Sequence, residues 1–311
     1  MKVLITGGAG YLGSIITQEL LNDGHKVTVI DNLMYNQISM LHLFNNENYK
    51  FIYGDVNNHI GLLPLIKEAE VIIPLAAIVG APACDKNPTL ANNVNFKQVE
   101  FIVNNANKEQ YIILPNTNSQ YGSSKEIITE NSPINPLSLY ARLKCDAEKC
   151  LLDSGNGISL RLATVFGLSP RMRMDLLVND FVYKAVHDGY LVLFESHFKR
   201  NYIHITDVAK TFKFMINNYE NRNGQIYNVG LSNANLSKFE LATKIKKYVP
   251  NLVIKEDDFK QDFDMRNYIV SNEKLESTGW KPNITLDDGI LQLVRAYPIL
   301  SNKLNKNFTN L

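Results

Sequence analysis

Cysteine is scarce in this chain. The 311 residues include three cysteines, and these have neither metal-ligand spacing nor the even number of a disulfide framework. With no signal peptide at its start, the sequence predicts free thiols in a reducing cytoplasm. Long apolar runs are lacking too: the most apolar stretch, residues 71–84, is broken by two prolines and a glycine and is too short to span a bilayer. We therefore expect no membrane segment and no metal site.

An excess of charge of one sign is also absent. Lysine and arginine total 32 and aspartate and glutamate total 31, which gives a formal net charge of +1. This balance provides no electrostatic footprint for nucleic acid, so we expect no nucleic-acid partner. The length is enough for one large domain or two smaller ones with an ample core.

The sequence does contain a glycine-rich turn, directly after an apolar run at its start. Residues 3–5 suit a parallel strand buried on both faces, and residues 14–21 follow at helical spacing. Between them, glycines allow the backbone to approach a diphosphate, to which the new helix offers free N–H groups. Glycines alone would fit an ordinary tight turn, but the strand and helix around them favour dinucleotide binding. The residues expected to bind the cofactor here are Gly7, Gly10, Tyr11, Leu12 and Gly13.

An acid follows the second expected strand, residues 26–30. Asp31 and Asn32 stand at its carboxyl end, where a carboxylate can bind both ribose hydroxyls of adenosine. That carboxylate would repel a 2′-phosphate by about 4 kcal/mol at ~4 Å and an intermediate effective dielectric. Since no Arg or Lys lies close by in the sequence to receive such a phosphate, NAD is favoured over NADP. The alternative for Asp31 is a solvated turn residue.

Strands and helices alternate through the first half of the chain. Further strands are predicted at 49–53, 70–74, 109–114 and 158–162, and helices at 37–44, 60–67, 87–107 and 138–152. This alternation predicts an α/β fold with a Rossmann-type doubly wound parallel sheet. From residue 166 the alternation fails, so we expect an NAD-binding domain over 1–165, with a return segment near 202–217, and a smaller α/β substrate lobe over 166–311.

Two more strand ends offer candidate cofactor contacts. Asp55 and Val56 follow the third strand and could hold and pack the adenine, although Asp55 could equally cap the next helix. Leu75, Ala76 and Ala77 follow the fourth strand, where small residues leave room for a ligand.

The predicted chemistry centres on the helix over 138–152. Tyr140 and Lys144 are four residues apart and therefore share a helix face. Tyrosine acts as a base near pH 7 only if its pKa of about 10 falls by ~3 units, which corresponds to ~4 kcal/mol. A neighbouring ammonium and a positive nicotinamide ring are charges of the kind that lower it. Such a pair is common by accident, but at this distance after the glycine turn it indicates catalysis.

The chain resembles an extended short-chain dehydrogenase/reductase of the nucleotide-sugar epimerase and dehydratase group over its whole length. The motifs that carry the resemblance are 6–13, Asp31-Asn32, Gly54-Asp55, Leu75-Ala76-Ala77, Asn93-Val94, Tyr121-Gly122, Tyr140 with Lys144, 161–167, 200–208 and 279–282. The resemblance implies that Tyr140 takes the proton of the sugar C4 hydroxyl as hydride leaves C4. It implies that Lys144 holds the nicotinamide ribose, that Thr117 binds the reacting hydroxyl, and that Asn93 contacts the cofactor.

The substrate implied by the resemblance is a nucleotide-diphosphate sugar. Arg200 and Arg266 match the arginines that bind its diphosphate, a role suited to the guanidinium fork. The full set of expected substrate-binding residues is Asn118, Ser119, Thr164, Arg171, Asn179, Arg200 and Arg266. For any single arginine, a surface salt bridge is the alternative.

Two departures from the family pattern narrow the reaction. Members that eliminate water across C5–C6 carry an Asp-Glu pair where this chain has Asn118 and Ser119, which do not titrate usefully. We therefore discount 4,6-dehydration and expect 4-epimerisation or net 4-dehydrogenation. Thr164 stands where many relatives have an asparagine that binds the substrate diphosphate.

The stretches 116–122, 169–181 and 200–204 resemble most the subgroup that includes the GDP-D-glycero-α-D-manno-heptose 4-dehydrogenases of bacterial surface-polysaccharide pathways. We expect an enzyme of this kind, with a 4-epimerase of UDP- or GDP-sugars as the alternative. A non-catalytic NAD-sensing protein is a further alternative, although the Tyr/Lys pair is intact. The family also implies a homodimer formed by the helices over 89–107 and 138–152.

Overall fold

The large sheet of this protein is built from parallel strands in the order β11-β7-β5-β4-β1-β2-β3. The computed structural model describes residues 1–36, 38–257 and 266–300, and within them this sheet has seven strands. Its strands are β1 (Lys2–Thr6), β2 (Lys26–Asp31), β3 (Tyr49–Tyr53), β4 (Val71–Pro74), β5 (Tyr111–Thr117), β7 (Ile158–Leu162) and β11 (Ile226–Val229). The order reverses beside β1, as in a doubly wound fold.

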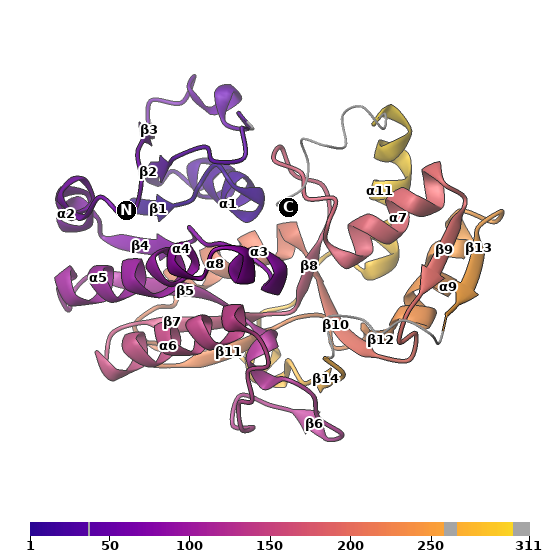
Figure 1. Cartoon of the computed structure of the whole chain (residues 1–311). Helices are drawn as coiled ribbons and strands as arrows, with labels where there is room; N and C mark the ends of the chain where they lie inside the picture. Colours follow the sequence, from indigo (N-terminus) through magenta and orange to yellow (C-terminus); the bar gives the residue numbers. More distant parts are fainter. Residues whose placement is uncertain (37, 258–265, 301–311) are drawn as a thin grey trace.

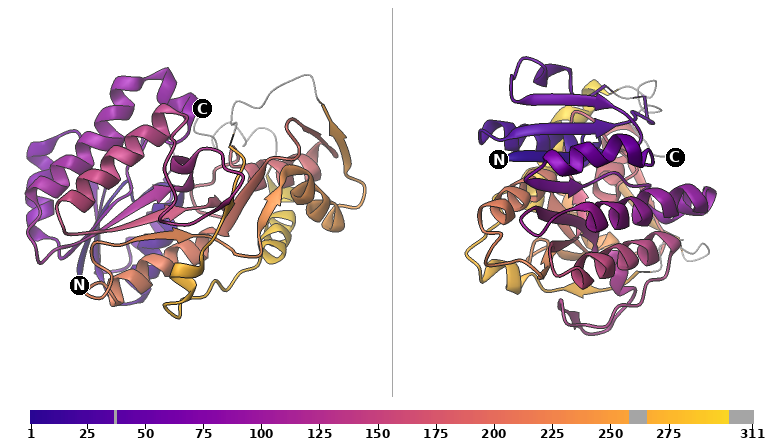
Figure 2. Two further views of the ribbon diagram at one scale, coloured as in Figure 1. Left: turned by 90° about the horizontal axis from the view of Figure 1, so that it is seen from below. Right: turned by 90° about the vertical axis from the view of Figure 1, so that its left-hand side faces the viewer.

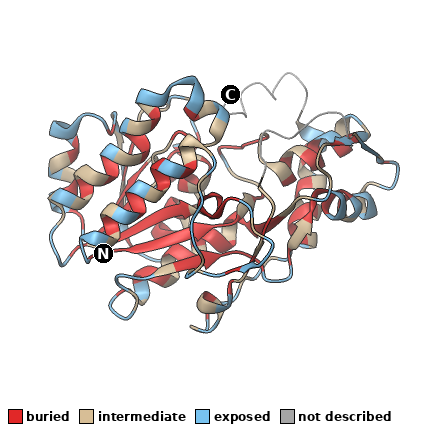
Figure 3. Cartoon of the chain, turned by 60° about the horizontal axis from the view of Figure 1, so that its bottom comes forward, coloured by how far each residue is buried: buried red, intermediate tan, exposed pale blue. Residues whose placement is uncertain are grey.

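The central strands are buried, and mostly apolar, because both faces of the sheet are covered. Residues 3–5 of β1 are at most 1% exposed, and β4 and β7 are buried along their whole length. Figure 3 shows the sheet as a buried layer between partly exposed helices. This is the environment that a continuous apolar run without alternation predicts.

Helices cover both faces of the large sheet, as Figures 1 and 2 show. One face packs against α1 (Tyr11–Asn22) and α8 (Ile205–Asn217), which contact each other. The other face packs against α2 (His59–Glu68), α5 (Gln98–Asn105) and α6 (Leu139–Asp153). The α/β fold with a doubly wound parallel sheet is therefore confirmed.

A second core lies beside the carboxyl ends of the large sheet. It contains a small sheet of β8 (Thr164–Phe166), β10 (Lys199–His204) and β12 (Asn235–Ser237), and the pair β9 (Tyr190–Leu193) and β13 (Val253–Glu256). The helices around it are α7 (Leu177–His187), α9 (Lys238–Tyr248) and α11 (Leu286–Ala296). A further pair, β6 (Ile127–Ile128) with β14 (Ile269–Val270), lies below it in Figure 1.

The remaining short elements connect these layers. They are η1 (Leu41–Leu43), α3 (Ala81–Lys86), α4 (Pro88–Asn92), η2 (Asn93–Lys97), η3 (Asn118–Tyr121), α10 (Glu273–Glu276) and η4 (Tyr297–Ile299). Among the residues described, no helix combines the length and the apolar character needed to cross a membrane.

The structure corrects several expected elements. The helix expected over 37–44 is reduced to the single turn of η1, and Gln37 lies outside the described residues. The helix expected over 87–107 is interrupted by the π-helical turn η2. Strand β5 continues to Thr117 instead of ending at residue 114. The edge strand β11 was not predicted at all, because its short run Ile226–Val229 is indistinguishable from a loop without its partner β7.

Candidate functional site

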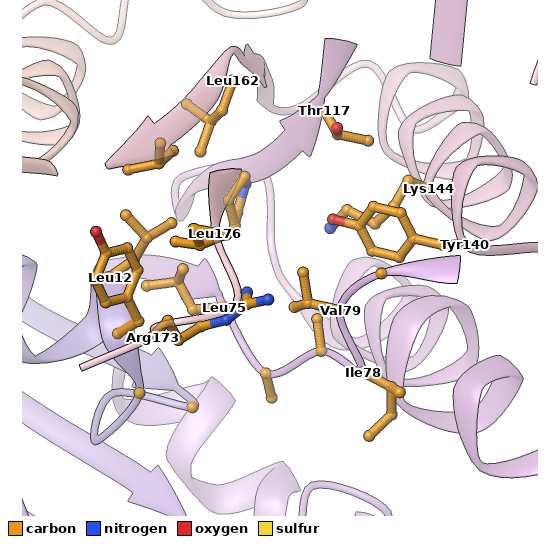
Figure 4. A pocket seen from close by; sticks show the side chains of 18 of the residues that line it. Leu12, Leu75, Ile78, Val79, Thr117, Tyr140, Lys144, Leu162, Arg173 and Leu176 are labelled. Carbon is orange, nitrogen blue, oxygen red and sulfur yellow. The ribbon is translucent and has the colours of Figure 1, made fainter. Parts of the chain in front are cut away.

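One deep cavity of about 1310 Å³ lies between the large sheet and the second core. Its floor is formed by the turns after β1, β2, β3 and β4 and by the end of β5. Its opposite wall comes from residues 164–177 and from Arg200, Lys238, Arg266 and Tyr268. A ligand in this cavity would therefore touch both cores at once (Figure 4).

The glycine turn after β1 makes a close backbone approach that a side chain would block. Gly7 has φ +70°, and a Cβ there would lie 2.6 Å from Ala76 Cα. A Cβ on Gly13 would lie 2.6 Å from the Gly7 carbonyl oxygen. Gly10 precedes the first residue of α1, Tyr11, so the first N–H groups of this helix border the cavity. Such a helix start attracts a diphosphate, as expected of a dinucleotide site.

Asp31 lines the next part of the cavity. Its carboxylate accepts hydrogen bonds from the Ala9 N–H at 3.0 Å and the Leu33 N–H at 2.8 Å. Burial raises the pKa of Asp31, and the two N–H groups and Arg171 oppose that shift. Asp31 is therefore a held, half-buried carboxylate and not a solvated turn residue.

Asp55 and Asn32 lie together beside Asp31. Asn32 Nδ2 donates to Asp55 Oδ2 at 3.2 Å, and the Asn57 N–H donates to Asp55 Oδ1 at 2.8 Å. The cap of α2 is Asn58, whose side chain accepts from the Gly61 N–H. Asp55 does not cap that helix, and it borders the cavity with Val56. Leu75 and the small residues Ala76 and Ala77 border it as well.

The Tyr/Lys pair stands at the other end of the cavity. Ser138 caps α6 by accepting from the Ala141 N–H at 3.2 Å, which fixes the first turn that carries Tyr140. Figure 4 shows the side chains of Tyr140 and Lys144 next to each other, with Thr117 nearby. The structure thus brings the three predicted catalytic residues to one place.

Burial dominates the titration of this pair. Burial lowers the pKa of Lys144 to about 8, against the opposing effect of Glu148. Burial also raises the pKa of Tyr140 to about 12, although Arg173 and Arg266 act to lower it. The lowered tyrosine pKa that we expected is absent from the protein alone, because desolvation outweighs these cations.

Thr117 belongs to a short chain of polar contacts. Its Oγ1 donates to Ser119 Oγ at 2.9 Å and accepts from the Ser119 N–H at 3.1 Å. Arg266 also donates to Ser119 Oγ. Arg266 was expected to bind a diphosphate, and in the structure its side chain contacts Ser119, the neighbour of Thr117 in this chain of contacts.

Other cations stand at the wall that faces the sheet. The Arg200 guanidinium lies 5.6 Å from the ring centre of Tyr268 and donates to the Lys199 carbonyl oxygen at 2.9 Å. Lys238, the first residue of α9, is buried and donates to the Phe194 carbonyl oxygen at 2.7 Å. Thr164 borders the same region.

Sequence reasoning missed Lys238, Tyr268 and Tyr35, all of which border the cavity. A usable signal existed for one of them: Lys238 follows the capping serine Ser237, where the positive end of a helix disfavours a lysine. Tyr268 gave no such signal, because the guanidinium near its ring belongs to Arg200, which is distant in the sequence.

Three expected site residues do not border the cavity. Asn93, the first residue of the π-helical turn η2, is exposed. Asn118 is 1% exposed, and its amide atoms have no hydrogen-bond partner among the described residues. Asn179 is fully buried and binds protein groups: it accepts from the Gly167 N–H at 3.0 Å and donates to the Arg173 carbonyl oxygen at 2.9 Å.

The sequence has relatives of similar length. It is 26% identical to a mouse dTDP-D-glucose 4,6-dehydratase, over 99% of this chain and 90% of the relative. It is also 26% identical to a putative UDP-glucose 4-epimerase of Methanocaldococcus jannaschii, over 94% of this chain and 97% of the relative. Two relatives with different activities match equally well, so these identities do not select one reaction.

Solved structures share the fold. A UDP-glucuronic acid 4-epimerase from Bacillus cereus, in complex with UDP-glucuronic acid and NAD, has a TM-score of 0.85 and 22% identity, with 96% of this chain and 99% of that chain covered. A UDP-glucose 4-epimerase from Thermus thermophilus, in complex with NAD, has a TM-score of 0.82 and 23% identity, with 97% and 100% covered.

A family model settles the affiliation. The NAD dependent epimerase/dehydratase family matches residues 3–230, which include the glycine turn, Asp31 and the Tyr/Lys pair. The cofactor of this family is NAD, and the close backbone approach at Gly7 and Gly13 fits it. The chain belongs to the NAD dependent epimerase/dehydratase family.

Proposed function

We propose that the protein oxidises C4 of a nucleotide-diphosphate sugar and releases a 4-keto sugar. The observation that carries this proposal is the position of Tyr140 and Lys144, which share one cavity with the glycine turn and Asp31. A sugar bound between Thr117 and Tyr140 would lie next to the nicotinamide end of a dinucleotide held by that turn.

In this reaction the C4–H bond and the O–H bond break together. When bound, NAD accepts the hydride that leaves C4. Tyr140 takes the hydroxyl proton onto its phenolate oxygen, and the C4–O bond becomes a carbonyl. Thr117 holds the reacting oxygen. Arg173 and Arg266 favour the phenolate, which the buried site otherwise disfavours. Lys144 would hold the nicotinamide ribose, as the family resemblance implies.

The residues beside Thr117 support oxidation without elimination. Ser119 is held by Thr117 and Arg266, and Asn118 is an amide. Neither can exchange a proton as the acid and base of a 4,6-dehydration must. We therefore rank dehydration below the two reactions that need only C4 oxidation, and we rank a non-catalytic sensor below them because the Tyr/Lys pair is intact.

For the substrate we propose a GDP-linked heptose, from the resemblance of the stretches around 116–122 and 169–181. Arg200, Lys238 and Tyr268 line the wall where its diphosphate and base would lie. A 4-epimerase is the second candidate, since it uses the same oxidation and then returns the hydride to the other face. The cavity of about 1310 Å³ would leave room for the keto sugar to rotate and present its other face to the cofactor. We also propose a homodimer through the helical segments over 89–107 and 138–152, as the resemblance to the family implies.

The experiment is a panel of GDP-, UDP- and dTDP-sugars with the purified protein, followed by absorbance of NADH and by identification of the product. A keto sugar with NADH left bound, or turnover only with a second carbonyl compound, supports the dehydrogenase. A C4-inverted sugar without an added acceptor supports the epimerase. A 4-keto-6-deoxy product, or Tyr140→Phe with unchanged turnover, would overturn the proposal.

A further inference from the structure

One segment of the cavity wall contacts the first turn of α1, which belongs to the proposed cofactor site. We call residues 167–176 the strap. It follows β8 and leads into α7, and it brings Arg171, Arg173 and Asp175 to the cavity. Figure 4 shows Arg173 and Leu176 of the strap facing the same space as Leu12 and Leu75.

The strap is tied to the start of the cofactor helix. Tyr11 Oη donates to the Gly167 carbonyl oxygen at 2.8 Å, and Ser169 Oγ donates to the Tyr11 carbonyl oxygen at 2.8 Å. Ser169 Oγ also lies 2.9 Å from Ser14 Oγ. The Asn179 side chain forms hydrogen bonds with the backbone of both Gly167 and Arg173. The strap is therefore positioned by α1, the element that the diphosphate of NAD would touch.

This anchoring places Arg171 at the adenosine end of the cavity. Its guanidinium carbon lies 4.4 Å from the ring centre of Tyr35, and both residues border the cavity with Asp31. Arg171 is only 3% exposed. The sequence suggested that Arg171 binds the substrate. The cations proposed to bind the diphosphate of the nucleotide sugar, Arg200 and Lys238, stand on other elements.

The loop that presents Tyr35 is itself held in an unusual conformation. Leu33 and Asn36 both have left-handed backbones, with φ of 51° and 54°. The Leu33 N–H is bound by Asp31, and the Asn36 N–H donates to the Leu33 carbonyl oxygen at 2.8 Å. Left-handed residues other than glycine cost energy and persist where the surroundings hold them. Here the held loop directs an aromatic ring toward Arg171.

We propose that Arg171 is a cofactor-binding residue: stacked on Tyr35, it supplies positive charge to the adenosine diphosphate half of NAD, and the strap slows cofactor release. Burial, followed by the neighbouring Arg173, lowers the pKa of Arg171, and Asp175 and Asp31 act in the opposite direction. The diphosphate of a bound cofactor would add to the negative charge around this buried guanidinium. Because a guanidinium binds phosphate oxygens in pairs, the diphosphate of NAD suits it chemically.

The test compares Arg171→Ala with wild type by calorimetric titration, using NAD, ADP-ribose and nicotinamide mononucleotide as separate probes. We expect the Kd of NAD and of ADP-ribose to rise about tenfold or more, and that of nicotinamide mononucleotide to stay within twofold. The exposed Arg295→Ala is the matched control and should leave all three unchanged. Tyr35→Ala should weaken the same two probes, whereas Tyr35→Phe, which keeps the ring, should not.

Cofactor release gives an independent readout. NADH fluorescence during displacement should show faster dissociation from Arg171→Ala, with melting temperatures confirming that each variant folds. If ADP-ribose binds Arg171→Ala as tightly as wild type, or if only GDP and UDP bind more weakly, the inference is overturned. Since none of these measurements needs turnover, they can succeed even if the proposed C4 oxidation is not found.

Discussion

Arg161 and Glu148 form a buried ion pair behind the Tyr/Lys pair. Arg161 Nη2 lies 2.5 Å from Glu148 Oε1, and both side chains are 5% exposed. Glu148 is one helical turn after Lys144, and it also accepts from Ser159 Oγ at 2.5 Å and Asn116 Nδ2 at 3.1 Å. Asn116 in turn donates to the Lys144 carbonyl oxygen at 3.1 Å. The ion pair therefore links α6 to β5 and β7 at the level of the site.

Glu148→Gln should destabilise the protein strongly. Removing one partner leaves the other charge buried and uncompensated, which costs about 3 kcal/mol or more. The matched control is Glu100→Gln, which breaks the exposed pair of Lys97 and Glu100 at 2.8 Å and should cost less than about 1 kcal/mol. Chemical denaturation measures both free energies of unfolding. Equal losses in the two variants would contradict the prediction.

Activity should fall as pH rises above about 8, because Lys144 then loses its proton. Stability should change in the opposite direction. The pKa of Lys144 is lowered on folding, so between about 8 and 10.5 the unfolded chain binds more protons than the folded one, and this group contributes stability that grows with pH. Rates and melting temperatures over pH 7–10 at constant ionic strength would separate the two trends. An alkaline loss of activity that follows unfolding would refute the first.

Gly7→Ala should weaken NAD binding at least tenfold, because its Cβ would collide with the backbone of Ala76 at 2.6 Å. Gly24→Ala separates this collision from backbone strain. Gly24 also has a positive φ, of +80°, but a Cβ there meets nothing within 4 Å. Gly24→Ala should therefore cost about 1 kcal/mol of stability and leave the Kd of NAD unchanged. Calorimetric titration measures both; a similar loss of affinity in both variants would count against the close approach.

Thr117→Val should lower kcat about a hundredfold, since it removes the hydroxyl proposed to hold the reacting oxygen. Ser119→Ala keeps Thr117 and removes only its neighbour, so its loss should be less than about tenfold. Steady-state kinetics with the substrate identified in the panel gives both values. The reverse ranking would move the reacting hydroxyl from Thr117 to Ser119.

The parts of the site that local sequence could predict are those made by one strand–turn–helix unit. Gly7 follows β1, Gly13 lies in the first turn of α1, and Asp31 ends β2. The rules for parallel sheets bring such strand ends to one edge. Tyr140 and Lys144 are related by the helix period alone. For these residues the chain near each position contains the relevant information, and the structure brings them to one cavity.

The rest depends on contacts between distant segments. Arg171 lies beside Asp31 only because the strap is tied to Tyr11 and Ser14. No Arg or Lys lies close to Asp31 in the sequence, but the fold brings Arg171 near it. Asn93 was expected to contact the cofactor, but it is exposed at the start of the π-helical turn η2. The pKa of Tyr140 was predicted from an ammonium and a nicotinamide ring, whereas the burial that raises it is produced by the whole fold.

The route of the chain between the two sheets limits how the protein can be divided. The chain leaves the large sheet after β7, runs through β8 and β10 of the small sheet, returns for β11, and leaves again for β12. A single cut near residue 165 would separate β11 from β7 and leave the edge of β7 unpaired, open to association with other chains. The chain thus passes several times between the large sheet and the small sheet. A nucleotide-binding fragment made by simple truncation should therefore be insoluble.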